Sequence, residues 1–380
     1  MAERLKKLWS NKHFRMLVLF LAIYSFLLSI EFIGAGFKGL GGDTSESLMK
    51  TIDDPLSAFF VGLLATALVQ SSSLTTSLLV MMTATGLIPV ETAIPAVMGA
   101  NIGTTITNTL VSFGHITRKQ EFSRAFSGAV VHDFFNIFAV IIILPIELVF
   151  HPILRISKKM TEAFVGVGGG KVASPVKEIT KPVSEAAHDV LASAVSNPEV
   201  VMIAIGIALL FLALKFLVSS TQYFVVGKGE KLINEYLFRG PMISFFLGMA
   251  LTGIIQSSSI TTSIIIPLVG AGILTVEKIF PYTLGANVGT TITAILAALA
   301  LGEAAGINIA FAHLTFNLMG IAIIYPHPKI RQIPINAAKR LGNYISKEGR
   351  RGKNLAIVMY ILVIFYVIPF IYIILSRRFH

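Results

Sequence analysis

Cysteine is absent from this sequence, and charged residues are scarce. Only 13% of the 380 residues are Asp, Glu, Lys or Arg, about half of the roughly 25% usual in soluble domains. Without cysteine the chain can form neither disulfides nor thiolate metal sites. The low charge, 54% hydrophobic residues and a mean hydropathy of +0.78 exclude an ordinary soluble domain and predict an integral membrane protein.

Long apolar runs support this class. Each is close to the ~20 residues that a helix needs to cross the hydrocarbon core. The first run is long and lacks a small-residue cleavage site, so it predicts a first span and not a signal peptide. The runs with almost no charge are residues 14–30, 126–146, 200–214, 307–324 and 355–375.

The net charge of +11 is concentrated in a few segments. Lys and Arg gather at residues 1–15, 115–124 and 329–353, next to apolar runs. This pattern follows the positive-inside rule and predicts a multi-pass plasma-membrane protein with a cytoplasmic N-terminus. The lipid bilayer is thus the expected surrounding, and nucleic acid is not an expected partner.

Two copies of one pattern organise the chain. "QSSSLTTS" starts at Gln70 and "QSSSITTS" at Gln256, 186 residues later (256 − 70 = 186). "GANIGTTIT" and "GANVGTTIT" place Asn101 and Asn287 at the same spacing. Such self-similarity predicts a repeated structural unit, with repeat cores at residues 56–145 and 241–326.

Each QSSS motif interrupts an apolar segment. In residues 56–86 the arms on either side hold ~15 residues, or about 22 Å of helix, too short for a comfortable crossing. A re-entrant helical hairpin with QSSS at its tip fits best, and two short spans remain an alternative. The next segment, 91–112, is expected to break at "GAN", as is its second copy.

These features predict an all-α membrane protein with two inverted-topology repeats, seven full crossings and two hairpins. The C-terminus would then lie outside. The expected divisions are a first transmembrane half at 1–150, a polar linker at 151–199 with a loop at 165–182, a second half at 200–326, a basic cytoplasmic loop at 327–353, and a final span with a short tail at 354–380.

The polar motifs have the chemistry of an ion site. Broken helices leave free N–H groups that attract anions and free carbonyls that coordinate sodium. Serine and threonine hydroxyls serve both ions. One such patch alone more often mediates helix packing, but two patches in identical register favour a site.

Cationic side chains are missing from the motif regions. Residues 56–112 contain no Lys or Arg, and residues 241–298 contain only Lys278. A buried divalent anion would therefore need accompanying cations. We hypothesise that sodium ions supply this charge, which would couple the two movements.

Other polar residues have simpler interpretations. Glu91 and Glu277 suit the first turn of a helix. "HDFFN" at residues 132–136 and "HLTFN" at 313–317 present His and Asn at i, i+4, which favours hydrogen bonding across the repeat interface. Glu31 and Asp133 are ionisable residues in or near spans and are candidates for cation coupling.

The paired QSSS and GAN motifs, with "EFSRAFSGAVVHDFFNIFAVIIILPIEL" between them, resemble the type II sodium–phosphate cotransporter family from about residue 54 to 326. The resemblance implies sodium-driven phosphate uptake by alternating access, with both QSSS regions at the substrate site. It also aligns Glu31 with an aspartate linked to electrogenicity. Unlike animal members, the central linker is short and cysteine-free, which indicates a prokaryotic member.

On this basis we assign ligands. The predicted phosphate ligands are Gln70, Ser71, Ser72, Ser73, Gln256, Ser257, Ser258 and Ser259. The predicted sodium ligands are Gln70, Ser71, Thr75, Asn101, Thr104, Gln256, Ser257, Thr261, Asn287 and Thr290.

Two alternatives stay open: a sodium-coupled sulfate or carboxylate carrier, and a gated ion channel. An enzyme is not expected, because no His, Asp or Lys of the polar clusters is placed to activate serine. Sodium ions are expected as co-transported ligands and no cofactor is expected. The oligomeric state is open, with a homodimer as one arrangement.

Overall fold

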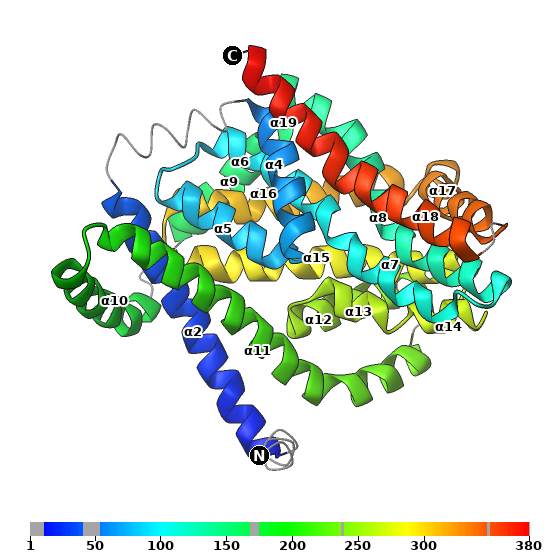
Figure 1. Ribbon diagram of the computed structural model, residues 1–380, viewed down its shortest axis with the longest axis horizontal. Helices are drawn as coiled ribbons and strands as arrows, with labels where there is room; N and C mark the ends of the chain where they lie inside the picture. The colour runs from blue at the N-terminus through cyan, green and yellow to red at the C-terminus, as the bar shows by residue number, and fades with distance from the viewer. Residues whose placement is uncertain (1–10, 41–53, 168–174, 237–238, 348–349, 380) are drawn as a thin grey trace.

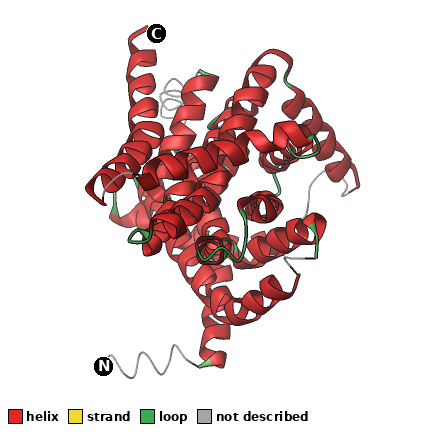
Figure 2. Ribbon diagram, turned by 90° about the vertical axis from the view of Figure 1, so that its right-hand side faces the viewer, coloured by secondary structure: helices red, strands yellow, loops and turns green. Residues whose placement is uncertain are grey.

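The computed structural model describes residues 11–40, 54–167, 175–236, 239–347 and 350–379. Across these ranges the chain is helical and contains no strand (Figure 2). Six helical segments are long and apolar enough to cross a membrane by length and composition. They are α2 (Lys12–Gly39), α8 (Lys119–Phe150), the Pro198–Thr221 part of α11 (Pro198–Tyr236), α15 (Val276–Leu301), α16 (Ala304–Ile324) and Asn354–Ser376.

The last segment combines three elements. α18 (Arg350–Leu362) passes through a π-helical turn, η3 (Val363–Val367), into α19 (Ile368–Phe379). Figure 1 shows them as one arm ending at the C-terminus, on the opposite side from the N-terminus. All five apolar runs of the sequence thus lie in helices, as predicted.

Both QSSS motifs join pairs of short helices, as predicted. α4 (Pro55–Val69) and α5 (Ser72–Ala84) meet at the first motif, whereas α12 (Pro241–Ile255) and α13 (Ser258–Ser263) meet at the second. α13 then leads into α14 (Ile266–Gly270). Asp54, Ser71 and Ser257 cap the starts of α4, α5 and α13 by accepting backbone N–H bonds.

The two GAN motifs differ in structure. In the first copy α6 (Val90–Ile102) ends just after the motif and continues through a 3₁₀ turn, η1 (Gly103–Thr105), into α7 (Ile106–Ser112) and η2 (Phe113–His115). The second GAN lies inside the unbroken α15, so the expected break there is wrong. The broken α6–α7 segment also explains why six candidate spans are found where seven crossings were expected.

Glycines in both GAN regions serve close helix packing. A Cβ added at Gly99 of α6 would lie 1.9 Å from the Phe59 carbonyl oxygen of α4. A Cβ at Gly285 of α15 would lie 1.9 Å from the Phe245 oxygen of α12. Only glycine, which lacks a Cβ, allows two helices to approach this closely. Gly99 and Gly285 therefore hold two helix pairs together and do not by themselves break a helix.

The predicted polar linker is largely helical. α9 (Pro152–Val167) and α10 (Pro175–Ala194) cover most of it, so the loop expected at residues 165–182 is wrong at 165–167 and 175–182; residues 168–174 lie outside the described ranges. The carboxylate of Glu147 accepts the N–H groups of Ile153 and Leu154 and so fixes the start of α9. The apolar face of α9 then packs on α16, where Phe164 meets Phe311 edge to face.

The predicted basic loop is also wrong in form, since residues 328–347 form helix α17 (Pro328–Lys347). Ile335, Ala338 and Ile345 are buried at helical spacing and pack toward α8. The hydroxyl of Ser123 in α8 donates to Asn343 in α17 (2.7 Å). The basic residues on the polar face of α17 dominate the composition of this segment, so its amphipathic helix was not predicted from the sequence.

Candidate functional site

Two glutamines occupy a backbone conformation that non-glycine residues rarely adopt. Gln70 (φ 59°) and Gln256 (φ 61°) are left-handed and end α4 and α12. Their side-chain Nε2 atoms donate to the carbonyls of Ala67 and Gly253. Such backbone strain costs roughly 1–3 kcal/mol and concentrates at functional sites. We call Gln70–Ser71 and Gln256–Ser257 the two glutamine turns.

The hydroxyls that follow each turn are mostly buried. Thr75 and Thr261 donate to the carbonyls of Ser71 and Ser257, one turn back in their own helices. Ser72, Ser73, Ser258 and Ser259 are also buried. The predicted phosphate ligands therefore stand at two equivalent helix junctions.

A threonine hydroxyl connects the second glutamine turn with Ser73 of the first QSSS motif. The hydroxyl of Thr293 in α15 donates to Gln256 Oε1 (2.5 Å). The same Thr293 hydroxyl lies 3.4 Å from the hydroxyl of Ser73. In the first copy Thr107, which is equivalent to Thr293, donates to Gln70 Oε1 (3.3 Å). The structure thus brings the two QSSS motifs together.

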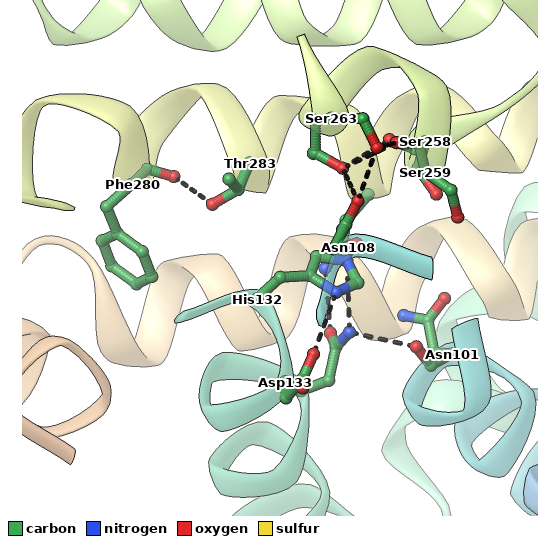
Figure 3. Close-up of polar contacts among 12 residues, drawn as sticks. Asn101, Asn108, His132, Asp133, Ser258, Ser259, Ser263, Phe280 and Thr283 are labelled. Atoms are coloured by element: carbon green, nitrogen blue, oxygen red, sulfur yellow. Dashed lines mark hydrogen bonds and ion pairs between the residues drawn. The ribbon is translucent and has the colours of Figure 1, made fainter. Parts of the chain in front are cut away.

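Asn108 forms a second link between the halves. Its Oδ1 accepts the hydroxyls of Thr262 (2.9 Å) and Ser263 (3.2 Å). Figure 3 shows Asn108 pointing toward the helix that carries Ser258, Ser259 and Ser263. Alanine stands at the equivalent position 294, so this link has no counterpart on the other side.

The GAN asparagine of the first copy binds the second half. Asn101 donates to Asn317 Oδ1 (2.9 Å), and Nε2 of His313 donates to Asn101 Oδ1 (3.1 Å). All three side chains are buried.

The second copy repeats this exchange in the opposite direction. Asn287 donates to Asn136 Oδ1 (2.8 Å), and its own Oδ1 accepts from His132 Nε2. Asn136 also donates to the Asn101 carbonyl (3.1 Å). The predicted hydrogen bonding of the His and Asn pairs across the halves is confirmed.

These contacts bear on the predicted sodium ligands. Both amide atoms of Asn101 and Asn287 are engaged within the protein. Thr290 donates to the Asn287 carbonyl (2.6 Å). The hydroxyl of Thr104 is buried without a partner among the described residues, as are those of the equivalent pair Thr66 and Thr252. A buried hydroxyl without such a partner keeps its lone pairs available to a cation, and a hydroxyl that only donates keeps them as well.

A cavity of about 280 Å³ lies between the two glutamine turns and α11. Water occupies ≈30 Å³ per molecule, so this space is large enough for a small hydrated anion. The residues that line it are Val69, Gln70, Ser71, Ser73, Leu74, Phe211, Leu214, Lys215, Val218, Ser219, Gln256 and Ser257.

The two acidic candidates do not line this cavity. Glu31 lines a separate cavity of about 520 Å³, together with residues of α2, α10 and the start of α16. Asp133 is buried in α8 and accepts the Tyr360 hydroxyl of α18 (2.9 Å). Any coupling role for either carboxylate would therefore act from outside the cavity between the turns.

Sequence reasoning missed four residues of this site: Thr107, Asn108, Lys215 and Thr293. Thr107 and Thr293 end the two "GTTIT" motifs, so the repeat itself carried their signal. Lys215 is a lone cation directly after the uncharged run 200–214. A single charge within a span is a recognisable signal, but the run was taken to end one residue before it.

The Asn287→Ala variant tests whether the exchanged contacts stabilise the fold. It leaves Asn136 and His132 buried without this partner, and we expect a cost of about 3 kcal/mol with a lower thermal midpoint in detergent. Thr283→Val is the matched control, because Thr283 donates only to Phe280 of its own helix (Figure 3). An unchanged basal midpoint combined with a lost sodium-induced rise would instead make Asn287 a sodium ligand.

The helical fold, the candidate spans and the buried polar centre define a multi-pass membrane protein. Residues 25–169 and 209–332 match the family described as Na+/Pi-cotransporter. The chain belongs to this family, as the resemblance of its motifs indicated.

Curated relatives carry matching names. "Sodium-dependent phosphate transport protein 2B" of Homo sapiens is 32% identical over 448 residues, covering 93% of this chain and 64% of that protein. "Sodium-dependent phosphate transport protein 2A" of Ovis aries is 31% identical over 423 residues, covering 91% and 65%. The chain thus spans just under two thirds of their length. No solved structure matches it.

Proposed function

We propose that this protein is a sodium-coupled secondary transporter that carries inorganic phosphate through the cavity between the two glutamine turns. One observation carries the proposal: Thr293 contacts both Gln256 and Ser73, so the duplicated motifs form one cavity and not two separate patches. Family membership and the names of the relatives support the choice of ions.

The lining of the cavity suits a phosphate with sodium ions. Hydroxyls and the Gln amides offer donors to phosphate oxygens and acceptors to a cation. α5 begins at Ser72, and the first N–H groups of a helix have no partner within it. Thr66 and Thr252, whose buried hydroxyls have no partner among the described residues, join the predicted Thr104 as candidates for holding sodium.

The path of the chain through the membrane is part of the same proposal. α4–α5 and α12–α14 form re-entrant hairpins within two inverted repeats, and the N-terminus is cytoplasmic in the plasma membrane. The equal spacing of both motifs and the reciprocal Asn101 and Asn287 contacts support two related halves. Alternating access then moves one half against the other.

The test is radiolabelled phosphate uptake into proteoliposomes. With sodium outside, we expect saturable uptake that falls to background when choline replaces sodium. Excess sulfate or citrate should compete weakly, because phosphate is the expected substrate. Equal uptake in choline, full competition by sulfate, or an ohmic conductance without saturation would each reject the proposal.

A further inference from the structure

One wall of the cavity comes from outside both repeat cores. α11 contributes five residues to it, while the two glutamine turns and their neighbours supply the rest. These five are Phe211, Leu214, Lys215, Val218 and Ser219. Four of them are apolar or uncharged, which leaves Lys215 as the one charged side chain among the described residues that line the cavity.

The position of Lys215 in the chain is unusual. It lies within Pro198–Thr221, a candidate membrane span in which Glu199 at the helix start is the other charged residue. An ionisable residue within a span is costly, and it marks an ion or substrate pathway by default. None of the described residues that line the cavity is a carboxylate, so an exogenous anion is the counter-charge that fits this ammonium.

A second cation lies near the same wall. Arg15 of α2 donates to the carbonyl of Ser219 (2.9 Å), and its guanidinium lies 4.5 Å from the Tyr223 ring centre. Ser219 itself lines the cavity, one helical turn after Lys215. The α11 side of the cavity is therefore positively charged, which attracts anions and raises their local concentration.

We propose that Lys215 is a phosphate ligand, whose ammonium receives the anion between the two glutamine turns. This inference rests on the proposed function and deepens it. Lys278 is the one cation in the motif regions and does not line the cavity, so the sequence alone left sodium to neutralise the anion. With Lys215 in place, one positive charge is fixed and one fewer mobile cation is needed for neutrality.

The decisive variants are Lys215→Gln and Lys215→Arg, with Lys158→Gln as control. Lys158 is an exposed lysine of α9 that does not line this cavity. We expect the KM for phosphate to rise about 10- to 100-fold in Lys215→Gln, because a hydrogen bond between charged groups is lost. Lys215→Arg keeps the charge and should stay within about threefold of wild type, and the control should not change.

Thermal stabilisation of the purified protein by inorganic phosphate provides a readout that does not need turnover. Lys215→Gln should require more phosphate than the wild type for the same rise in thermal midpoint. If Lys215→Gln misfolds, Lys215→Met, which has an apolar side chain of similar length, takes its place in the experiment. Wild-type KM and stabilisation in both neutral variants would overturn the inference while leaving the proposed function intact. Absence of sodium-driven uptake by the wild type would instead reject the proposed function.

Discussion

Gln256→Gly is expected to abolish most phosphate uptake with little net change in stability. The substitution removes an amide that lines the cavity and contacts Thr293. Loss of hydrogen bonds to ionic ligands costs about 1.5–3 kcal/mol each, so we expect sodium-driven uptake to fall about 100-fold. Gln70→Gly should behave in the same way, because Gln70 occupies the equivalent turn.

Glycine is the informative replacement because of the backbone. Gln256 has φ 61°, which glycine adopts without penalty. The relief of backbone strain opposes the loss of the buried hydrogen bonds to Thr293 and Gly253, so the thermal midpoint should change little while transport is lost. Alanine would mix the two effects, since it keeps the backbone strain and loses the amide.

His151→Gly is the matched control for both turns. Within the described residues, His151 (φ 50°) is the third non-glycine residue with positive φ, and it follows α8 outside the cavity. The His151→Gly variant is relieved of the same backbone strain, and it should take up phosphate at the wild-type rate. Normal uptake by Gln256→Gly and Gln70→Gly would refute the assignment of the site.

Gly285→Ala is expected to give the largest loss of stability. The added Cβ would meet the Phe245 carbonyl oxygen at 1.9 Å, so α15 and α12 must separate. Overpacking costs about 1–3 kcal/mol and occasionally more; a clash with backbone on a rigid helix belongs at the upper end. The measurement is the thermal midpoint and the monodisperse fraction in detergent.

Gly99→Ala should show a similar loss, because Gly99 meets the Phe59 oxygen at the same distance. Gly114→Ala serves as the control, since a Cβ there meets nothing within 4 Å. Variants at 99 and 285 that match the control in stability would contradict the close packing of α4 on α6 and of α12 on α15.

Hydrophobicity and repetition predicted much of this fold. The apolar runs became helices, and both QSSS motifs fell at helix junctions, because buried hydroxyl clusters and short arms are poorly compatible with one continuous helix. The motif repeat also predicted which residues are equivalent, and the His and Asn pairs at i, i+4 predicted the hydrogen bonds between the halves.

The errors have distinct physical causes. Glycine next to asparagine suggested a break in both copies, but Gly285 is used for contact with α12 and α15 stays helical. α9, α10 and α17 were missed because their polar faces dominate composition, while their apolar faces find partners only in the folded protein. Lys215 was missed because the uncharged run was taken to end at residue 214, although the helix and the candidate span continue past it.

The reciprocal contacts of Asn101 and Asn287 have an evolutionary consequence. Each asparagine finds its partners in the opposite half, so a half-length ancestor folded alone would have left this side chain buried and unsatisfied. Two identical half-length subunits facing each other would have supplied these hydrogen-bond partners to each other. In the present chain the two halves are covalently joined, so this pairing is permanent, and features such as Asn108, with alanine at position 294, differ between them.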